Sequence, residues 1–129
     1  MQTFEKVLTV LQKDLDDLNH VNNVRYVQWV QDVAEEHWML KASAQILENY
    51  FWVMISHHIQ YKGQAFLNDE LLIKTFVTKS EGVTSTRMVE IYNKTSGKLL
   101  TNSETNWCFM SKVTNRPTRI TQEVIDLFN

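Results

Sequence analysis

One long helical pattern precedes four strand-like segments in this chain, and this order restricts the fold more than any other feature. From about residue 23 to residue 48, polar residues recur at helical spacing and apolar residues fill a wide opposite arc. A first strand is expected before the helix, at residues 4–12. Strand character returns after the helix in four segments, at residues 51–61, 71–79, 84–93 and 99–112. A helix segregated from antiparallel strands indicates an α+β fold, in which a sheet of about five strands wraps around a long central helix.

The turns between these elements should be short, because 129 residues contain only three glycines and one proline. No linker or shift in composition divides the chain, so residues 1–129 are expected to form a single domain. Within 51–61, the residues Val53, Ile55, His57, Ile59 and Tyr61 should share one face of a strand. Such a sheet leaves an edge uncovered, which favours dimerisation.

Composition excludes several classes of protein. Lys and Arg total 13 against 15 Asp and Glu, a formal net charge of −2, which does not suit a protein that neutralises nucleic-acid phosphates. No apolar run approaches the ~20 residues of a membrane helix. The single cysteine, Cys108, cannot form an internal disulfide. We therefore expect a cytoplasmic protein that binds neither nucleic acid nor membrane.

Polar side chains are concentrated immediately before the helix, in "KDLDDLNHVNNVRYVQWVQD" at residues 13–32. A helix start presents unpaired N–H groups that can stabilise an oxyanion, and a carboxylate a few residues upstream can act on the same carbonyl as base or nucleophile. The alternative is that Asp16, Asp17, Asn19 and Asn22 only cap the helix and solvate a loop, a common use of these residue types. The residue types alone do not separate these interpretations.

The same stretch resembles a motif of the hotdog-fold thioesterases, in the branch similar to 4-hydroxybenzoyl-CoA thioesterase. That branch typically reads D-x-D-x-x-G-H-V-N-N-x-x-Y before the central helix. The motif D-L-D-x-N-x-H-V-N-N-V-x-Y-x-x-W of plant acyl-ACP thioesterases is also similar. The residues of this chain that match one or both motifs are Asp14, Leu15, Asp16, His20, Val21, Asn22, Asn23, Val24, Tyr26 and Trp29.

The resemblance implies a hotdog fold and hydrolysis of an acyl thioester carried on coenzyme A or acyl carrier protein, without a metal ion or other cofactor. It implies that Asp16 is the catalytic carboxylate and that the backbone N–H near Asn23 polarises the thioester carbonyl. Asp14, Asn19, His20 and Asn22 would support the loop. Tyr26 and Trp29 would contact substrate, in a homodimer or a dimer of dimers whose site lies at the subunit interface.

Two positions depart from the motifs. Asn19 replaces a common glycine, and asparagine tolerates positive φ better than other residues with a side chain. Leu18 replaces the asparagine that is catalytic in the plant enzymes, so His20 is expected to brace the loop rather than to catalyse. These changes leave two alternatives open: a hotdog protein that binds acyl thioesters without turnover, and a hotdog hydratase or dehydratase.

Overall fold

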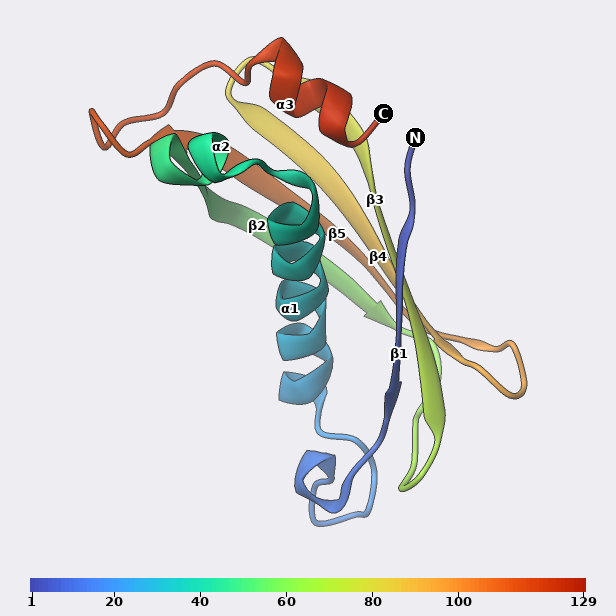
Figure 1. The fold of residues 1–129 in the computed structure, drawn as a ribbon. Coiled ribbons are helices and arrows are strands. Elements are labelled where there is room, and N and C mark those ends of the chain that lie inside the picture. The colour runs from blue at the N-terminus through green and yellow to red at the C-terminus, as the bar shows by residue number, and fades with distance from the viewer.

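The computed structural model describes all 129 residues and contains one antiparallel sheet with three α-helices. The elements in chain order are β1 (Phe4–Thr9), the 3-10 helix η1 (Gln12–Asp14), α1 (Asn23–Lys41), α2 (Ala44–Asn49), β2 (Tyr50–Tyr61), β3 (Glu70–Glu81), β4 (Thr84–Asn93), β5 (Leu99–Ser111) and α3 (Gln122–Leu127). The strands lie in the order β1-β3-β4-β5-β2, and every neighbouring pair is antiparallel. The predicted α+β class and five-stranded sheet are confirmed (Figure 1).

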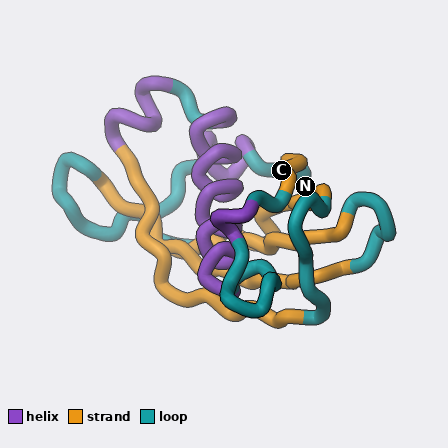
Figure 2. Tube along the Cα trace, turned by 90° about the horizontal axis from the view of Figure 1, so that it is seen from below, coloured by secondary structure: helices purple, strands orange, loops and turns teal.

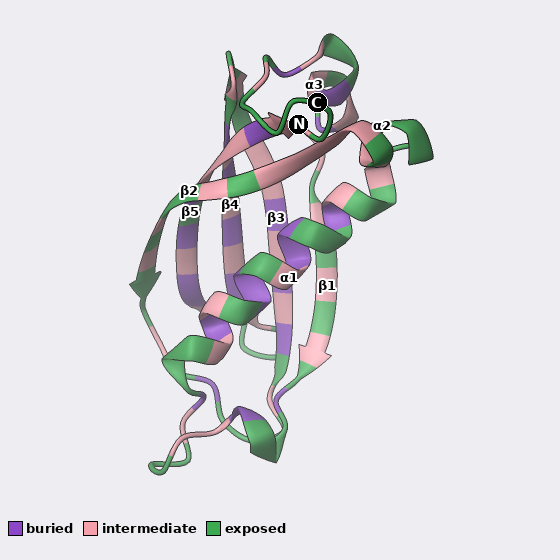
Figure 3. Ribbon diagram, turned by 90° about the vertical axis from the view of Figure 1, so that its left-hand side faces the viewer, coloured by how far each residue is buried: buried purple, intermediate pink, exposed green.

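Helix α1 lies on one face of the sheet, and the strands curve around it (Figure 2). One side of the helix is buried and the other is exposed (Figure 3). The main core forms where this buried side meets the sheet, and its 12 members include Trp29, Val30, Val33, Ile73 and Ile91. A smaller core of Ile46, Phe109, Ile120 and Val124 lies beside α2 and α3. No helix is long and apolar enough to cross a lipid bilayer.

The predicted helix over 23–48 is two helices. Helix α1 ends at Lys41, Ala42 takes an extended conformation, and the Ser43 side chain accepts a hydrogen bond from the Ile46 N–H at 3.2 Å. Serine bonds its neighbours' backbone readily, and this N-cap starts a new helix in a new direction. The central helix is therefore 19 residues long, shorter than predicted.

Two strand predictions also need correction. The first strand ends at Thr9, and residues 12–14 form a 3-10 turn. In β2 the pairing with β5 shifts between Met54 and Ser56, the position of a β-bulge. One extra residue reverses the faces of a strand, so Val53 and Ile55 point away from the core whereas Ile59 packs against it. The expected face shared from Val53 to Tyr61 is therefore wrong.

Candidate active site at the start of helix α1

The polar residues before α1 form a small loop whose two sides are joined by backbone hydrogen bonds. The Asp16 N–H donates to the His20 carbonyl at 2.7 Å, and the Asn22 N–H donates to the Asp14 carbonyl at 2.9 Å. An isolated β-bridge joins Leu15 to Val21 between them. Residues 14–16 and 20–22 thus run antiparallel, and the segment 14–23 is held in one conformation at the lower end of α1 in Figure 1.

Asn19 occupies the tip of this loop with φ of 62°, in the left-handed region. Few residues with a side chain adopt this conformation at low cost, and asparagine is one of them. The expectation that the turn survives replacement of glycine by asparagine is confirmed.

Asp16 is half-buried and has one carboxylate oxygen free. Its Oδ1 accepts hydrogen bonds from the Leu18 N–H at 2.9 Å and the His20 N–H at 3.1 Å. Its Oδ2 has no hydrogen-bond partner in the chain. Asp16 therefore closes the turn with one oxygen and keeps the other for a ligand or water.

The two neighbouring carboxylates differ from Asp16. Asp14 is 3% exposed, its Oδ1 lies 2.8 Å from Nε of Arg25, and its Oδ2 accepts from the Leu11 N–H. Asp17 is exposed and makes no side-chain hydrogen bond or ion pair. Of the three, only Asp16 combines a fixed position with an available oxygen.

The first turn of α1 leaves one backbone donor without a partner. Asn22 is the N-cap: its Oδ1 accepts from the Val24 N–H at 3.0 Å, and its carbonyl accepts from the Arg25 N–H at 2.8 Å. The Asn23 N–H has no acceptor in the chain. An open N–H at the positive end of a 19-residue helix is a donor suited to a carbonyl oxygen that gains negative charge.

The β2–β3 connection packs against this loop. The Ala65 N–H donates to the Tyr26 hydroxyl at 3.0 Å, and the Val21 N–H donates to the Ala65 carbonyl at 3.2 Å. His20 meets the ring of Phe66 edge to face, with centroids 5.5 Å apart. Burial raises the pKa of the Tyr26 phenol above its usual value, so this hydroxyl is neutral. These contacts join the β2–β3 connection to the loop and to the first turn of α1.

Tyr26 and Trp29 are 2% and 5% exposed and belong to the main core. Their rings meet edge to face at 5.6 Å. The structure places both in the first turns of α1, next to the polar loop, and their contact with substrate stays a prediction. It brings Asp14, Asp16, Asn19, His20, Asn22 and Asn23 together in one segment.

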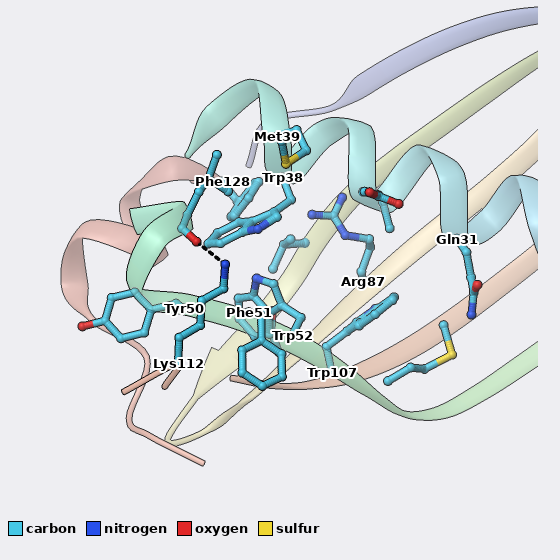
Figure 4. A pocket seen from close by; sticks show the side chains of 16 residues that line it. Gln31, Trp38, Met39, Tyr50, Phe51, Trp52, Arg87, Trp107, Lys112 and Phe128 are labelled. Carbon is cyan, nitrogen blue, oxygen red and sulfur yellow. Dashed lines mark hydrogen bonds between the residues drawn. The ribbon is translucent and has the colours of Figure 1, made fainter. Parts of the chain in front are cut away.

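A cavity of about 560 Å³ lies further along α1, lined by 16 residues of which 11 are hydrophobic. Figure 4 shows the aromatic rings of Trp38, Trp52 and Trp107 around it. At one end, Lys112 donates to the Leu47 carbonyl. No residue of the segment 14–23 lines this cavity. Its lining comes from six elements, α1, α2, β2, β3, β4 and β5, together with Lys112 and Phe128, so sequence spacing does not reveal it.

Arg87 lines the same cavity and is 6% exposed. Its Nη1 lies 2.9 Å from Nδ1 of His37 and 3.0 Å from Oγ1 of Thr75. Burial and the nearby Arg87 lower the pKa of His37 to about 4, and burial lowers the pKa of Arg87 to about 10. At neutral pH, therefore, His37 is uncharged and accepts a hydrogen bond from a charged guanidinium. His37 is therefore a core histidine with its hydrogen bond satisfied.

The sequence interpretation overlooked Arg87, although a signal was present. In β4 the residues Ser85, Arg87, Val89 and Ile91 alternate toward the core, so a charged residue occupies a register otherwise used for burial. A buried arginine is uncommon unless it is paired, and it often marks a binding site.

Comparison with known proteins shows the family and the fold of the chain. A family model described as the thioesterase-like superfamily matches residues 10–128, so the chain belongs to this superfamily. No curated protein sequence matches closely enough to indicate a relative.

Solved structures share the fold at low sequence identity. A 1,4-dihydroxy-2-naphthoyl-CoA thioesterase from Synechocystis superimposes with a TM-score of 0.84 at 18% identity, covering 98% of this chain and 95% of that chain. The protein SAV2348 from Staphylococcus aureus, solved in complex with CoA, gives 0.86 at 18% identity over 98% and 81% of the two chains. A 12:0-ACP thioesterase from Umbellularia californica gives 0.84 at 13% identity over 98% of this chain and 51% of that chain. The predicted hotdog fold is confirmed, and membership of the superfamily supports thioester hydrolysis as the general class of activity.

Proposed function

We propose that the protein is a cytoplasmic thioesterase that hydrolyses an acyl group carried on coenzyme A or acyl carrier protein. The observation that carries the proposal is the pairing of a free Asp16 oxygen with a free Asn23 N–H in one rigid segment. The family match and the CoA complex of the S. aureus protein support a thioester substrate.

In the proposed reaction, the thioester oxygen accepts a hydrogen bond from the Asn23 N–H, which stabilises the charge that develops on this oxygen. Asp16 Oδ2 takes a proton from a water molecule as the water attacks the carbonyl carbon. The tetrahedral intermediate then breaks its C–S bond, and the departing sulfur receives the proton. In the second form of the mechanism, Asp16 attacks the carbonyl carbon, the C–S bond breaks, and the departing thiolate takes a proton from water. Water then hydrolyses the resulting anhydride, which releases the free acid and restores the Asp16 carboxylate.

The loop geometry supports a substrate carbonyl between these two groups. Asp14 pairs with Asn22 and Asp16 pairs with His20, so the position opposite Asn23 is residue 13. Asp16 lies three residues along the chain from that position. At ~3.4 Å per extended residue from 14 to 16 and ~2 Å for the 3-10 step from 13 to 14, the backbone interval is roughly 9 Å. Such an interval accommodates the Asp16 side chain, an attacking water and a carbonyl group.

We also propose that the site is completed in a homodimer or a dimer of dimers. Strand β2 lies at the edge of the sheet, and its side chains Val53 and Ile55 are 45% and 57% exposed. Leu18 and Val24, which flank the candidate catalytic groups, are 74% and 69% exposed. An unpaired edge strand and exposed apolar side chains are stabilised when another protein surface packs against them, and a second subunit would supply that surface. Sedimentation at micromolar concentration should show no major monomer, and a fully active monomer would refute the shared site.

The test of the reaction is thiol release from acyl-CoA and acyl-ACP substrates, from acetyl to palmitoyl with aryl examples. Asp16→Asn should lower kcat by about 10²–10⁴, the usual effect of losing an acid–base group. Its remaining side-chain oxygen can still accept from Leu18 and His20, so thermal unfolding should change little. Saturable acyl-CoA binding without release in the wild type would favour the non-catalytic alternative, and hydration of an enoyl-CoA would favour the hydratase.

The neighbouring carboxylates provide matched controls. Asp17→Asn should be nearly silent, because this side chain is exposed and unpaired. Asp14→Asn should weaken the contact with Arg25 and lower the free energy of unfolding by about 2 kcal/mol, with an intermediate loss of activity through the loop. If Asp16→Asn retains near-normal turnover while either control abolishes it, the catalytic assignment is wrong.

A further inference from the structure

The cavity beside the second half of α1 has a charged group at an apolar wall, and this combination indicates what the cavity binds. Arg87 is enclosed almost completely, yet no carboxylate of the chain forms a salt bridge with it. Its partners are all uncharged: the His37 ring, the Thr75 hydroxyl and the ring of Phe128, 5.2 Å away. A buried charge without a counter-charge is costly, and a ligand anion can supply the missing partner.

The guanidinium also has unused donors. An arginine has five N–H groups, and in Arg87 only those of Nη1 have acceptors in the chain. The unused donors of Arg87, on Nε and Nη2, are not fully enclosed by protein atoms. They therefore retain access to open space. Figure 4 shows the side chain reaching into the space between α1 and Trp107, within the cavity.

The charges that line the cavity favour a single negative charge. Arg87 and Lys112 are positive and Glu35 is negative, so the lining carries one excess positive charge. Lys112 is engaged with the Leu47 carbonyl at the α2 end, which leaves Arg87 as the free cation. A planar guanidinium pairs most favourably with a planar carboxylate, through two parallel hydrogen bonds.

The remaining lining fits an apolar body of medium length. The cavity volume of about 560 Å³ lies within the range of small-molecule sites. The lining extends along α1 from Gln31 to Met39, a distance of about 12 Å at 1.5 Å per residue. Trp38, Trp52 and Trp107 supply broad apolar contact along this length.

We propose that this cavity binds a medium-chain apolar carboxylate, whose carboxyl group pairs with Arg87 and whose chain packs among the tryptophans. The site does not depend on the proposed hydrolysis, because no residue from 14 to 23 contributes to it. It accepts a free acid rather than a thioester, since a thioester has no charge at the carbonyl to satisfy Arg87.

The test is binding of decanoate, 1-decanol and decylamine to the intact protein, followed by calorimetry and by tryptophan fluorescence. Decanoate should bind at least about tenfold more tightly than decanol, as expected for a hydrogen bond between charged groups, and decylamine should bind most weakly. Equal affinity for decanoate and decanol, or no binding of decanoate, would overturn the proposal.

Variants identify the group responsible. Arg87→Met should weaken decanoate binding about 10- to 100-fold and leave decanol binding within a few-fold, whereas Arg87→Lys should lie between this variant and the wild type. Glu35→Gln, at an exposed position, should strengthen decanoate binding about threefold by removing a like charge. If Arg87→Met does not fold, the ligand comparison in the wild type and the Glu35→Gln result still decide. Unchanged decanoate affinity in a folded Arg87→Met variant, or in Glu35→Gln, would contradict the assignment.

Discussion

The two halves of helix α1 support chemically different environments. At its start, short-range hydrogen bonds hold Asp16 and Asn22, and the groups left free are one carboxylate oxygen and one backbone N–H. Along its second half, the helix faces a wall of aromatic rings and a buried charge on Arg87. The first environment is suited to acting on a carbonyl group, and the second is suited to holding an apolar molecule.

The two environments also differ in how far apart in the sequence their contacting residues lie. Every group of the polar loop lies between Asp14 and Asn23, and most of its hydrogen bonds span two to eight residues. The cavity requires six elements to come together, and its decisive contact joins His37 to Arg87 across 50 residues. A substitution in one region should therefore leave the other unchanged.

A large effect, second to that of Asp16→Asn, is expected from Asn23→Pro, which removes the proposed oxyanion donor and little else. Proline is favoured at the first position of a helix, where its fixed φ suits the chain. The preceding residue, Asn22, already has the extended conformation that proline requires, with φ of −63° and ψ of 134°. We expect kcat to fall by about 10²–10³, as for loss of an oxyanion-hole donor, with an almost unchanged melting temperature.

Asn23→Ser is the matched control, because serine changes the side chain and retains the N–H. It should keep substantial activity. Val24→Pro is a harsher variant: it removes the N–H that Asn22 caps and restricts Asn23, so it should impair both activity and the helix start. Normal turnover by a folded Asn23→Pro protein would exclude this N–H as the oxyanion donor. Decanoate binding should be the same in all three variants.

The loop and the fold differ in how far the sequence predicts them. Periodicity is sufficient for the strands and for α1, because patterns of two and 3.6 residues follow directly from backbone geometry. It did not locate the end of α1, where the cap at Ser43 competes with an uninterrupted helical pattern. It also missed the bulge near Ile55, which depends on pairing with β5.

The candidate site and the cavity were likewise predictable from the sequence only in part. The polar loop was predictable because a local motif supplies both its turn and its helix cap. The residue types alone did not separate Asp14, Asp16 and Asp17, and only the resemblance to the thioesterase motifs assigned them roles, since the contacts depend on which carboxylate meets Arg25 and which meets the turn. The cavity was not predictable, because a charged residue in a strand becomes informative only when the opposing elements are known.

The free energy of unfolding should depend on pH through His37, which contacts Arg87 beside the cavity. His37 has a folded-state pKa of about 4, below its ordinary value of 6.5, so the unfolded chain binds more protons between these values. Its contribution to stability is complete above pH 6.5 and is lost as the pH falls toward 4. Between pH 7 and pH 5, this residue alone should lower the free energy of unfolding by about 2 kcal/mol.

His37→Gln should abolish this part of the pH dependence, because glutamine can accept from Arg87 and does not titrate. Urea unfolding at pH 7 and pH 5 gives, for each protein, the change in the free energy of unfolding between the two pH values. Comparing this change between the wild type and His37→Gln cancels the loss of ring packing on Phe4 and Phe128, because that loss is the same at both pH values. Burial also lowers the pKa of His57, and this contribution is common to both proteins. Equal pH sensitivity in the two proteins would show that the His37–Arg87 contact does not control acid stability.

The smallest effect is expected from Leu18→Asn, which restores the residue of the plant acyl-ACP thioesterases at the tip of the polar loop. Leu18 contacts Asp16 through its backbone N–H, at 2.9 Å, whereas its side chain is 74% exposed. The substitution leaves that N–H in place, so kcat should change by less than about threefold, under 1 kcal/mol in activation free energy. Thiol release on the preferred substrate measures it, with Asp17→Asn as the neighbouring exposed control. A rise of more than about tenfold would mean that the added amide orients water for Asp16. The polar loop would then be an incomplete version of the plant arrangement, rather than a site that works with Asp16 and the helix N–H alone.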